Sequence, residues 1–322
     1  MIFSSKATPQ RRNAVTGAVA KVLGALCLGL LVSCGGGTSQ VDPFRPGRLL
    51  VFGDDSSTIT ITGRKYNVNG LNASSVFDCS LEPIWVQSMA TAYGFAFAEC
   101  NPTFIETKAI MRAVVGARVA DVTAQVEAQV AAGGFRDKDL ATVLAGINDI
   151  LDLYAQYPGR SADSLVAEAR ARGEQLANVV NRLVGLGVKV VVSDLPDMGL
   201  SPYAVAQRAL DPTGVDRAAV ISSLVTGFNE QLGVKVVLDG RFVGLVQAQL
   251  RFQAIGRSPA SFGLANITDG LCRVALPNCT TNTIVAGATT TQYLWADDTR
   301  LSTAGQAQLA SLAIDRARRN PF

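Results

Sequence analysis

Acidic and amide side chains follow four apolar segments of this chain, and they are the residues best suited to do chemistry. They lie in FGDDSS, AGINDI, VSDLPDMG and YLWADDTR, each of which begins at the end of a predicted strand. Ligands of open parallel sheets bind beyond the carboxyl ends of the strands. We therefore expect these side chains to meet at one edge of a sheet.

Apolar strands alternate with helices along the sequence. Strands are expected at 49–52, 140–149, 188–196 and 241–247, helices at 82–94, 117–134, 161–187, 216–233 and 302–319, and a small hairpin at 58–70. This alternation predicts an α/β fold with a parallel sheet covered on both faces. No glycine-rich phosphate loop follows a strand, so the sequence gives nucleotide binding no support, and we expect no cofactor.

Four motifs, in this order, resemble those of the GDSL (also called SGNH) hydrolases, a family of lipases and esterases. They are VFGDDSS, VVGARVADV, AGINDIL and YLWADDTRLSTAGQ, and the similarity extends from about Leu49 to Ala313. The resemblance implies a three-layer α/β/α sandwich with a flavodoxin-like parallel sheet. It also implies a single domain over 49–322.

The resemblance assigns five positions to the catalytic site. The family's oxyanion donors fall on the backbone N–H of Gly116 and the side-chain amide of Asn148, and its triad acid falls on Asp297. Two positions depart from the family: Asp55 stands where the serine is expected, and Arg300 stands where the histidine is expected. The whole chain contains no histidine.

These departures remove the usual mechanism, because a serine hydroxyl needs a base with a pKa near neutrality. Arginine, with a pKa above about 12, cannot accept a proton at that pH. Ser56 and Ser57 follow too late, because such a turn directs one side chain to the sheet edge. Asp55 could itself attack an ester, with Asp297 or Asp298 activating water afterwards. The alternative is that Asp55 is a structural charge.

An acid and a cation at two positions that contact each other in the family predict an ion pair. We expect Asp55 to bind Arg300, and Asp297 to hold the far side of the guanidinium, which has donors for both carboxylates. Gly116 and Asn148 would then donate to Asp55. Their other interpretations are structural: a glycine that permits a close approach and an asparagine that caps a turn.

The first 33 residues are typical of an export signal, with four bases, no acid and an eleven-residue apolar run. Leu31-Val32-Ser33-Cys34 resembles the lipobox of bacterial lipoproteins, which implies cleavage before Cys34 and its acylation. Gly35 in place of aspartate favours the outer membrane. Residues 34–48 would be a flexible tether. An uncleaved membrane anchor is the alternative, although the apolar run is short for a bilayer.

Cleavage would also change the charge, because the chain has 29 bases and 26 acids in total. Without the four bases that precede Cys34, the net charge is −1. Such a balance does not indicate a nucleic-acid partner. The predicted partners are the membrane, through the lipid, and an acyl or acetyl ester, while the oligomeric state stays open.

Four cysteines remain in the mature chain, and an exported context favours disulfides. Of three possible connectivities we expect Cys79 with Cys100 and Cys272 with Cys279, four free thiols being the alternative. Asp194 and Asp197 form an acidic loop without histidine, which is more typical of a turn than of a metal site. No metal is therefore predicted.

Three functions are compatible with these observations. The favoured one is a lipid-anchored envelope protein with an esterase-like fold that lacks Ser–His ester hydrolysis and serves as a binding scaffold. The second is an active acyl or acetyl ester hydrolase with a carboxylate mechanism. The third is a purely structural envelope protein whose cleft is closed.

Overall fold

The computed structural model describes residues 1–2, 44–211 and 214–322. The predicted signal, Cys34 and most of the tether therefore lie outside the described residues. The chain divides into two units, Met1–Asp42 and Pro43–Phe322, and the second contains the sheet and the candidate site. None of the helices in the described ranges is long and apolar enough to cross a membrane.

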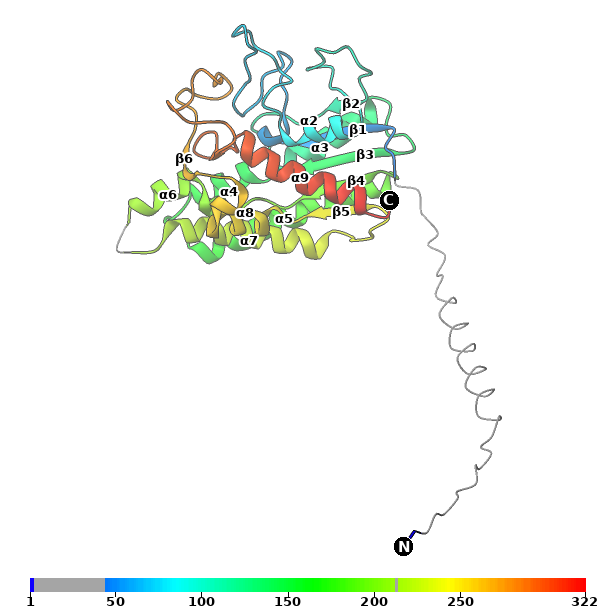
Figure 1. The fold of residues 1–322 in the computed structure, drawn as a ribbon. Coiled ribbons are helices and arrows are strands. Elements are labelled where there is room, and N and C mark those ends of the chain that lie inside the picture. Colours follow the sequence, from blue (N-terminus) through cyan, green and yellow to red (C-terminus); the bar gives the residue numbers. More distant parts are fainter. Residues whose placement is uncertain (3–43, 212–213) are drawn as a thin grey trace. The chain divides into compact units, whose positions relative to one another are not determined.

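A five-stranded parallel sheet forms the centre of this unit (Figure 1). Its strands are β1 (Arg48–Gly53), β2 (Ala109–Met111), β3 (Asp139–Leu144), β4 (Lys189–Ser193) and β5 (Val243–Val246). They lie in the order β2-β1-β3-β4-β5, which is the flavodoxin-like order with its switch point beside β1. The predicted α/β fold class is confirmed.

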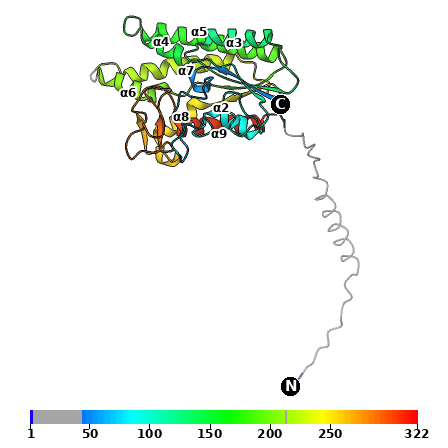
Figure 2. The ribbon, with the colours of Figure 1, turned by 90° about the horizontal axis from the view of Figure 1, so that it is seen from above.

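Helices cover both faces of the sheet and make the three layers visible in Figure 2. One face carries α3 (Val119–Ala131), α4 (Ile147–Tyr154), α5 (Ala162–Gly185), α6 (Pro202–Ala209) and α7 (Arg217–Lys235). The other carries α2 (Trp85–Ala92), α8 (Ala248–Arg257) and α9 (Thr303–Arg319). The central strands are buried on both sides, which explains their unbroken apolar runs.

Polar caps set where the long helices begin. The side chains of Ser161, Asp216 and Ser302 accept hydrogen bonds from backbone N–H groups in the first turns of α5, α7 and α9. Each such cap is worth about 1 kcal/mol. The closing helix α9 therefore begins three residues after Arg300, within the motif that also carries Asp297.

Two predicted elements are wrong in detail. The YLW segment is β7 (Tyr293–Trp295), which pairs with β6 (Asn266–Gly270) in a separate two-stranded sheet. The polar turn expected after β3 is instead the first turn of α4, so Asn148 and Asp149 are helical. Both differences arise because short apolar segments do not reveal their tertiary partners.

The hairpin predicted over 58–70 is also absent, apart from an isolated bridge between Ile59 and Lys65. The buried ammonium of Lys65 donates to the carbonyl oxygens of Cys79, Leu81 and Glu82, at 3.0, 2.5 and 2.8 Å. Burial lowers the pKa of Lys65 to about 8. This loop is therefore held largely by the side chains of Lys65 and Asn69 rather than by a ladder of backbone hydrogen bonds.

The described end of the predicted tether belongs to the folded unit. The ring of Phe44 packs against that of Phe322, with centroids 5.4 Å apart. β1 begins at Arg48, whose guanidinium binds the buried carboxylate of Asp139 at 2.5 Å. The domain therefore starts about five residues earlier than expected, because an aromatic contact and an ion pair fix these residues.

Both predicted disulfides are confirmed. Cys79 binds Cys100 and Cys272 binds Cys279, with Cα atoms 5.7 and 5.8 Å apart. The first joins the loop before α2 to the segment after it. The second closes a short loop next to Asn69, whose side-chain amide donates to the carbonyl of Cys279.

Candidate functional site

The site begins at the sharp turn that ends β1. Gly53 has φ +144°, and a Cβ there would lie 2.1 Å from the carbonyl oxygen of Leu144 on the neighbouring strand. Only glycine fits this position. Asp54 then caps a short 3₁₀ helix, η1 (Asp55–Ser57), by accepting the N–H of Ser56. This turn places Asp55 at the carboxyl edge of the sheet.

The carboxylate of Asp55 is held by three groups from three other segments. Its Oδ2 accepts the backbone N–H of Gly116 and the side-chain amide of Asn148, each at 3.0 Å. Its Oδ1 lies 3.3 Å from Nη2 of Arg300. Gly116 adopts φ +73°, which turns its N–H toward Asp55 at no steric cost. The ion pair and both donors are where the sequence predicts them.

Asp297 lies on the other side of the guanidinium, as expected. Its Oδ2 is 3.5 Å from Nη1 of Arg300, and its Oδ1 accepts the backbone N–H groups of Thr299 and Arg300. Burial acts to lower the pKa of Arg300, but the carboxylates of Asp55 and Asp297 outweigh it and the pKa lies above its ordinary value. The five residues form one charged network.

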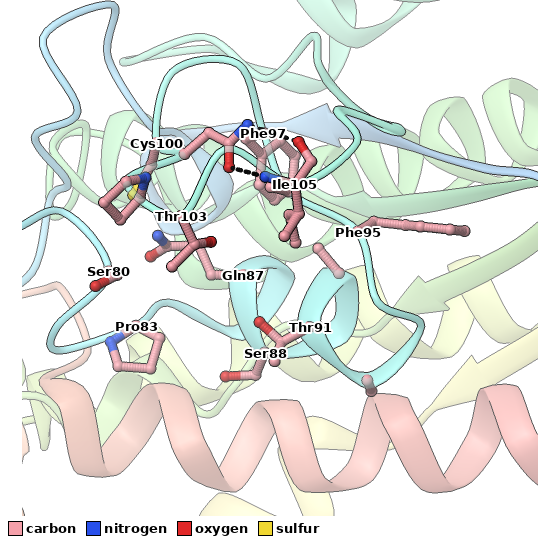
Figure 3. Close-up of a pocket in the computed structure, with 15 residues that line it drawn as sticks. Ser80, Pro83, Gln87, Ser88, Thr91, Phe95, Phe97, Cys100, Thr103 and Ile105 are labelled. Atoms are coloured by element: carbon pink, nitrogen blue, oxygen red, sulfur yellow. Dashed lines mark hydrogen bonds between the residues drawn. The ribbon is translucent and has the colours of Figure 1, made fainter.

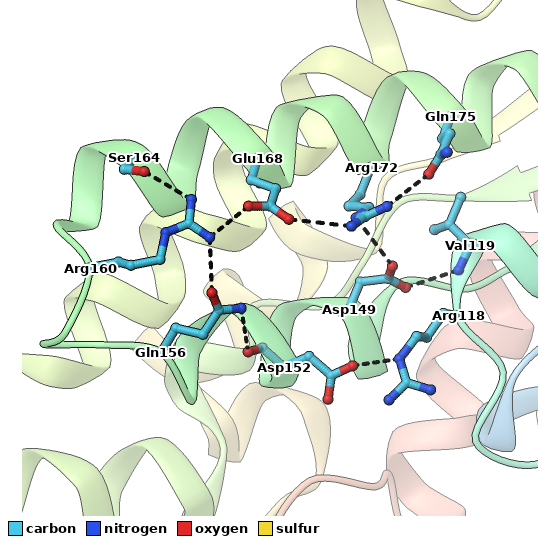
Figure 4. Close-up of polar contacts among 10 residues, drawn as sticks. All are labelled: Arg118, Val119, Asp149, Asp152, Gln156, Arg160, Ser164, Glu168, Arg172 and Gln175. Carbon is cyan, nitrogen blue, oxygen red and sulfur yellow. Dashed lines mark hydrogen bonds and ion pairs between the residues drawn. The ribbon is translucent and has the colours of Figure 1, made fainter.

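Charged side chains on α3, α4 and α5 fix the helix that carries Asn148 (Figure 4). The next residue, Asp149, accepts the N–H of Val119 at the start of α3, and Arg172 of α5 lies 3.8 Å from its other oxygen. Burial raises the pKa of Asp149. Arg118 and Asp152 form a second link between α3 and α4 at 2.5 Å. Gly116 and Asn148 therefore keep a fixed separation.

Almost no space remains around the network. The residues Asp54, Asp55, Ser56, Ile147, Asn148, Thr299 and Arg300 enclose only about 10 Å³. A single water needs about 10–15 Å³ measured in this way. An ester carbonyl therefore cannot reach the N–H of Gly116 or the amide of Asn148 unless Asp55 moves.

Sequence reasoning missed Asp54, which is fully buried beside Asp55. Burial and repulsion from Asp55 raise the pKa of Asp54 to about 7. Its Oδ2 has no hydrogen-bond partner among the described residues. The adjacent aspartates were visible in the sequence, but their different environments were not.

Two further contacts to Arg300 were not predicted. The hydroxyl of Thr299 accepts from Nη1 at 3.0 Å, and the ring of Tyr66 lies under the guanidinium at 5.7 Å. Thr299 stands inside the last motif, where its role could have been suspected. Tyr66 lies in the loop held by Lys65, and no periodic pattern points to it.

The remaining candidates have structural contacts. The hydroxyl of Ser57 accepts from the indole of the buried Trp85 at 3.1 Å, whereas Ser56 borders the small space beside Asp55. Asp197 caps a 3₁₀ turn and accepts from Ser222, and Asp194 accepts the N–H of Gln249. Across the described ranges, no three His, Cys, Asp or Glu side chains are grouped to hold a metal.

Two larger pockets lie outside the network. One, of about 660 Å³, borders Gly116 and is lined by the 111–117 segment and α3. The other, of about 550 Å³, lies between α2 and the 95–105 segment, where Asn101 bonds twice to the backbone of Ile105 (Figure 3). Only the first is close enough to the site to share a residue with it.

No protein-family model matches the sequence, and no curated protein matches it. Solved structures to which the fold is similar include a lipase from a goat rumen metagenome, with 12% identity, a TM-score of 0.48, and coverage of 85% of this chain and 97% of that one. A member of the lipolytic G-D-S-L family from Veillonella parvula has 13% identity, a TM-score of 0.44 and coverage of 83% and 96%. An acetylxylan esterase from Geobacillus stearothermophilus has 16% identity, a TM-score of 0.42 and coverage of 86% and 96%.

Proposed function

We propose that this chain is an SGNH-type protein whose site is locked by its own charges, so that it binds or supports rather than hydrolyses esters. The observation that carries the proposal is the position of the Asp55 carboxylate. It accepts the two donors, Gly116 and Asn148, that the family resemblance assigns to the oxyanion of an ester. Arg300 binds its other oxygen.

The residues of the network supply no route for acyl transfer. A serine nucleophile needs a base near neutral pKa, and the cation at that position holds its proton. Attack by Asp55 would require it to leave Gly116, Asn148 and Arg300, and the resulting anhydride would still need an activated water. The first step expels an alkoxide that must gain a proton, and the water that opens the anhydride must lose one, which the guanidinium of Arg300 cannot accept at neutral pH.

The experiment is a hydrolysis assay of the purified full chain with 4-nitrophenyl acetate and butyrate. We expect no turnover above buffer for the wild type. We expect turnover in Asp55→Ser combined with Arg300→His, because the serine would lie beside Gly116 and Asn148 and the histidine beside Asp297. Asp55→Ser alone is the control that lacks a base. Wild-type turnover that Asp55→Ala abolishes would overturn the proposal in favour of the carboxylate mechanism.

The ligand of such a scaffold is an acyl group bound in the pocket beside Gly116. Small apolar residues dominate its lining, including Ala113, Val115 and Ala117. Calorimetric titration with octanoate should give binding that Val115→Asp weakens by about tenfold, since the new carboxylate faces the probe. Val205→Asp, at an equally exposed valine on α6, is the control. Equal binding by both variants would place the ligand elsewhere.

The anchor is an acylated Cys34, proposed from the lipobox-like LVSC sequence. Mass spectrometry of the N-terminal peptide and incorporation of an alkyne fatty acid should both detect the lipid. Cys34→Ala should abolish the incorporation. An unmodified Cys34 on a chain that retains residues 1–33 would indicate an uncleaved anchor instead.

A further inference from the structure

The edge of the sheet where the strands begin carries an excess of positive charge. We define this basic edge as the residues just before or at each strand start, with the end of α9: 44–48, 105–109, 135–139, 185–189, 239–243 and 315–319. These segments hold ten lysines or arginines and five acids. The net charge of −1 expected after cleavage gives no indication of this local excess of bases.

Most of the acids on the basic edge are already neutralised. Asp139, Glu106, Asp239 and Asp315 each form an ion pair with a base of the same edge. Asp137 is the remaining acid, against six bases that pair with no acid within the described ranges. The three arginines in the last turn of α9 interact favourably with the helix dipole. The helix dipole does not account for the bases that precede the strands.

The opposite edge of the sheet has the reverse charge. It carries the site, and the five residues after each strand of the sheet, 54–58, 112–116, 145–149, 194–198 and 247–251, hold five acids, most of them buried, and two bases, Arg112 and Arg251. The folded unit therefore has one basic and one acidic edge. A charge separation of this kind orients a protein at a charged surface.

The chain also enters the folded unit at the basic edge. Phe44 packs against Phe322, and the backbone N–H of Gly47 donates to the carbonyl of Lys138, which fixes the entry point among the bases. Figure 1 shows the C-terminus at this end of the sheet, away from α6. Cys34 precedes Phe44 by ten residues, which span at most about 35 Å.

We propose that the basic edge binds the anionic phospholipid surface to which the chain is anchored, with the site directed away from the membrane. The inference rests on the proposed lipid at Cys34. Two features favour a membrane as the partner: the charge of the edge, and a short segment that confines this edge near the lipid. A lipid anchor and a basic patch both contribute to attachment at an anionic membrane surface.

The test measures which end of the domain lies near the lipid headgroups. The native cysteines are in disulfides or at Cys34 and the signal, so Ala132→Cys and Ala155→Cys provide single exposed labelling sites. Ala132 lies beside the basic edge and Ala155 at the far end of α4. The full lipidated chain, labelled at one site, is incorporated into phosphatidylcholine vesicles with an acceptor on the headgroups, with or without phosphatidylglycerol.

We expect energy transfer from position 132 to exceed that from 155, and phosphatidylglycerol to increase the difference. High salt should abolish the increase that phosphatidylglycerol causes, because exposed charges are screened within about 3 Å at 1 M. Arg136→Gln with Arg318→Gln should reduce the affinity for added phosphatidylglycerol vesicles by about tenfold. Arg257→Gln with Arg273→Gln removes the same charge elsewhere and should have no effect.

A difference between the two labels that phosphatidylglycerol does not increase, or greater transfer from position 155, would overturn the proposal. So would tighter retention on double-stranded DNA than on the vesicles at the same salt. If mass spectrometry finds no lipid on Cys34, the two label sites are introduced together with Cys27→Ser and Cys34→Ser, the labelled protein is added to preformed vesicles, and the same readings apply. Failure of the anchor and failure of the basic edge are thus recorded separately.

Discussion

At the scale of single residues, the carboxylate of Asp55 acts as a ligand of its own site. It accepts the N–H of Gly116 and the side-chain amide of Asn148, which also donates to the carbonyl of Ala117. The negative charge of Asp55 is balanced by an ion pair with Arg300, and Arg300 forms a second ion pair with Asp297. Asp55 and Arg300 therefore act as one unit.

Removing one member of this unit should cost more than neutralising the pair. Arg300→Ala leaves the nearly buried charge of Asp55 without a cation, and breaking such a pair costs up to about 3–5 kcal/mol. Asp55→Asn with Arg300→Gln keeps hydrogen-bonding groups and removes both charges. We expect Arg300→Ala to lower the melting temperature more than the double variant does.

Thermal unfolding of both variants beside the wild type measures this difference. Arg64→Ala, a half-buried arginine with one long hydrogen bond of 3.5 Å, is the control for the loss of an arginine side chain. A double variant less stable than Arg300→Ala would mean that the charges stabilise the fold by themselves.

The sequence was sufficient for the five site residues because motif order carries them. Asp55 follows β1 as expected, whereas Asp297 and Arg300 follow β7 of the separate two-stranded sheet, so the motif and not the predicted sheet placed them. Tyr66 could not be predicted, because it reaches Arg300 from a loop whose course depends on the buried ammonium of Lys65. A contact made by tertiary structure leaves no periodic signal in the sequence.

At the scale of elements, the two disulfides should differ in their contribution to stability. The Cys79–Cys100 bond closes a separation of 21 residues, and the Cys272–Cys279 bond one of 7. Chain entropy gives about 3 kcal/mol for the first and roughly 1 kcal/mol less for the second. Replacing the first pair by alanines should therefore lower the free energy of unfolding more.

Urea titrations of the two double-alanine variants test this order, with the slope m checked for changes in the unfolded state. Reduction of the wild type should reproduce the sum of the two losses. If the Cys272–Cys279 variant is the less stable, packing of the buried Cys279 outweighs loop closure.

The strands and long helices were predictable from the sequence, whereas the short elements were not. β1 is a continuous apolar run, and α5 has an amphipathic pattern that begins at a capping serine, so both can be recognised in the sequence. β2 has three residues and is defined by pairing with β1. β3 ends at Leu144 and α4 begins at Ile147, so the apolar segment 140–149 contains the end of a strand and the start of a helix with no break in its pattern.

At the scale of the whole molecule, buried carboxyl groups should make stability depend on pH in an uncommon direction. Burial raises the pKa of both Asp54 and Asp194 to about 7, from an ordinary value of 3.8. Between these values the folded protein binds more protons than the unfolded chain. The free energy of unfolding should therefore fall as the pH rises from about 4 to about 7, by at most about 4 kcal/mol for each group.

Asparagine at these positions should remove the dependence, because it keeps the shape and cannot ionise. Asp54→Asn can still accept the N–H of Ser56, and Asp194→Asn that of Gln249. We expect each variant to be less pH-dependent than the wild type between pH 5 and pH 8 and more stable at pH 8, since the buried charge is gone. The double variant should be nearly flat. Exposed Asp163→Asn is the control and should follow the wild type. Urea unfolding across this range decides the matter: a wild-type stability that rises from pH 5 to pH 8 would show that both carboxyls ionise at their ordinary pKa in the folded protein.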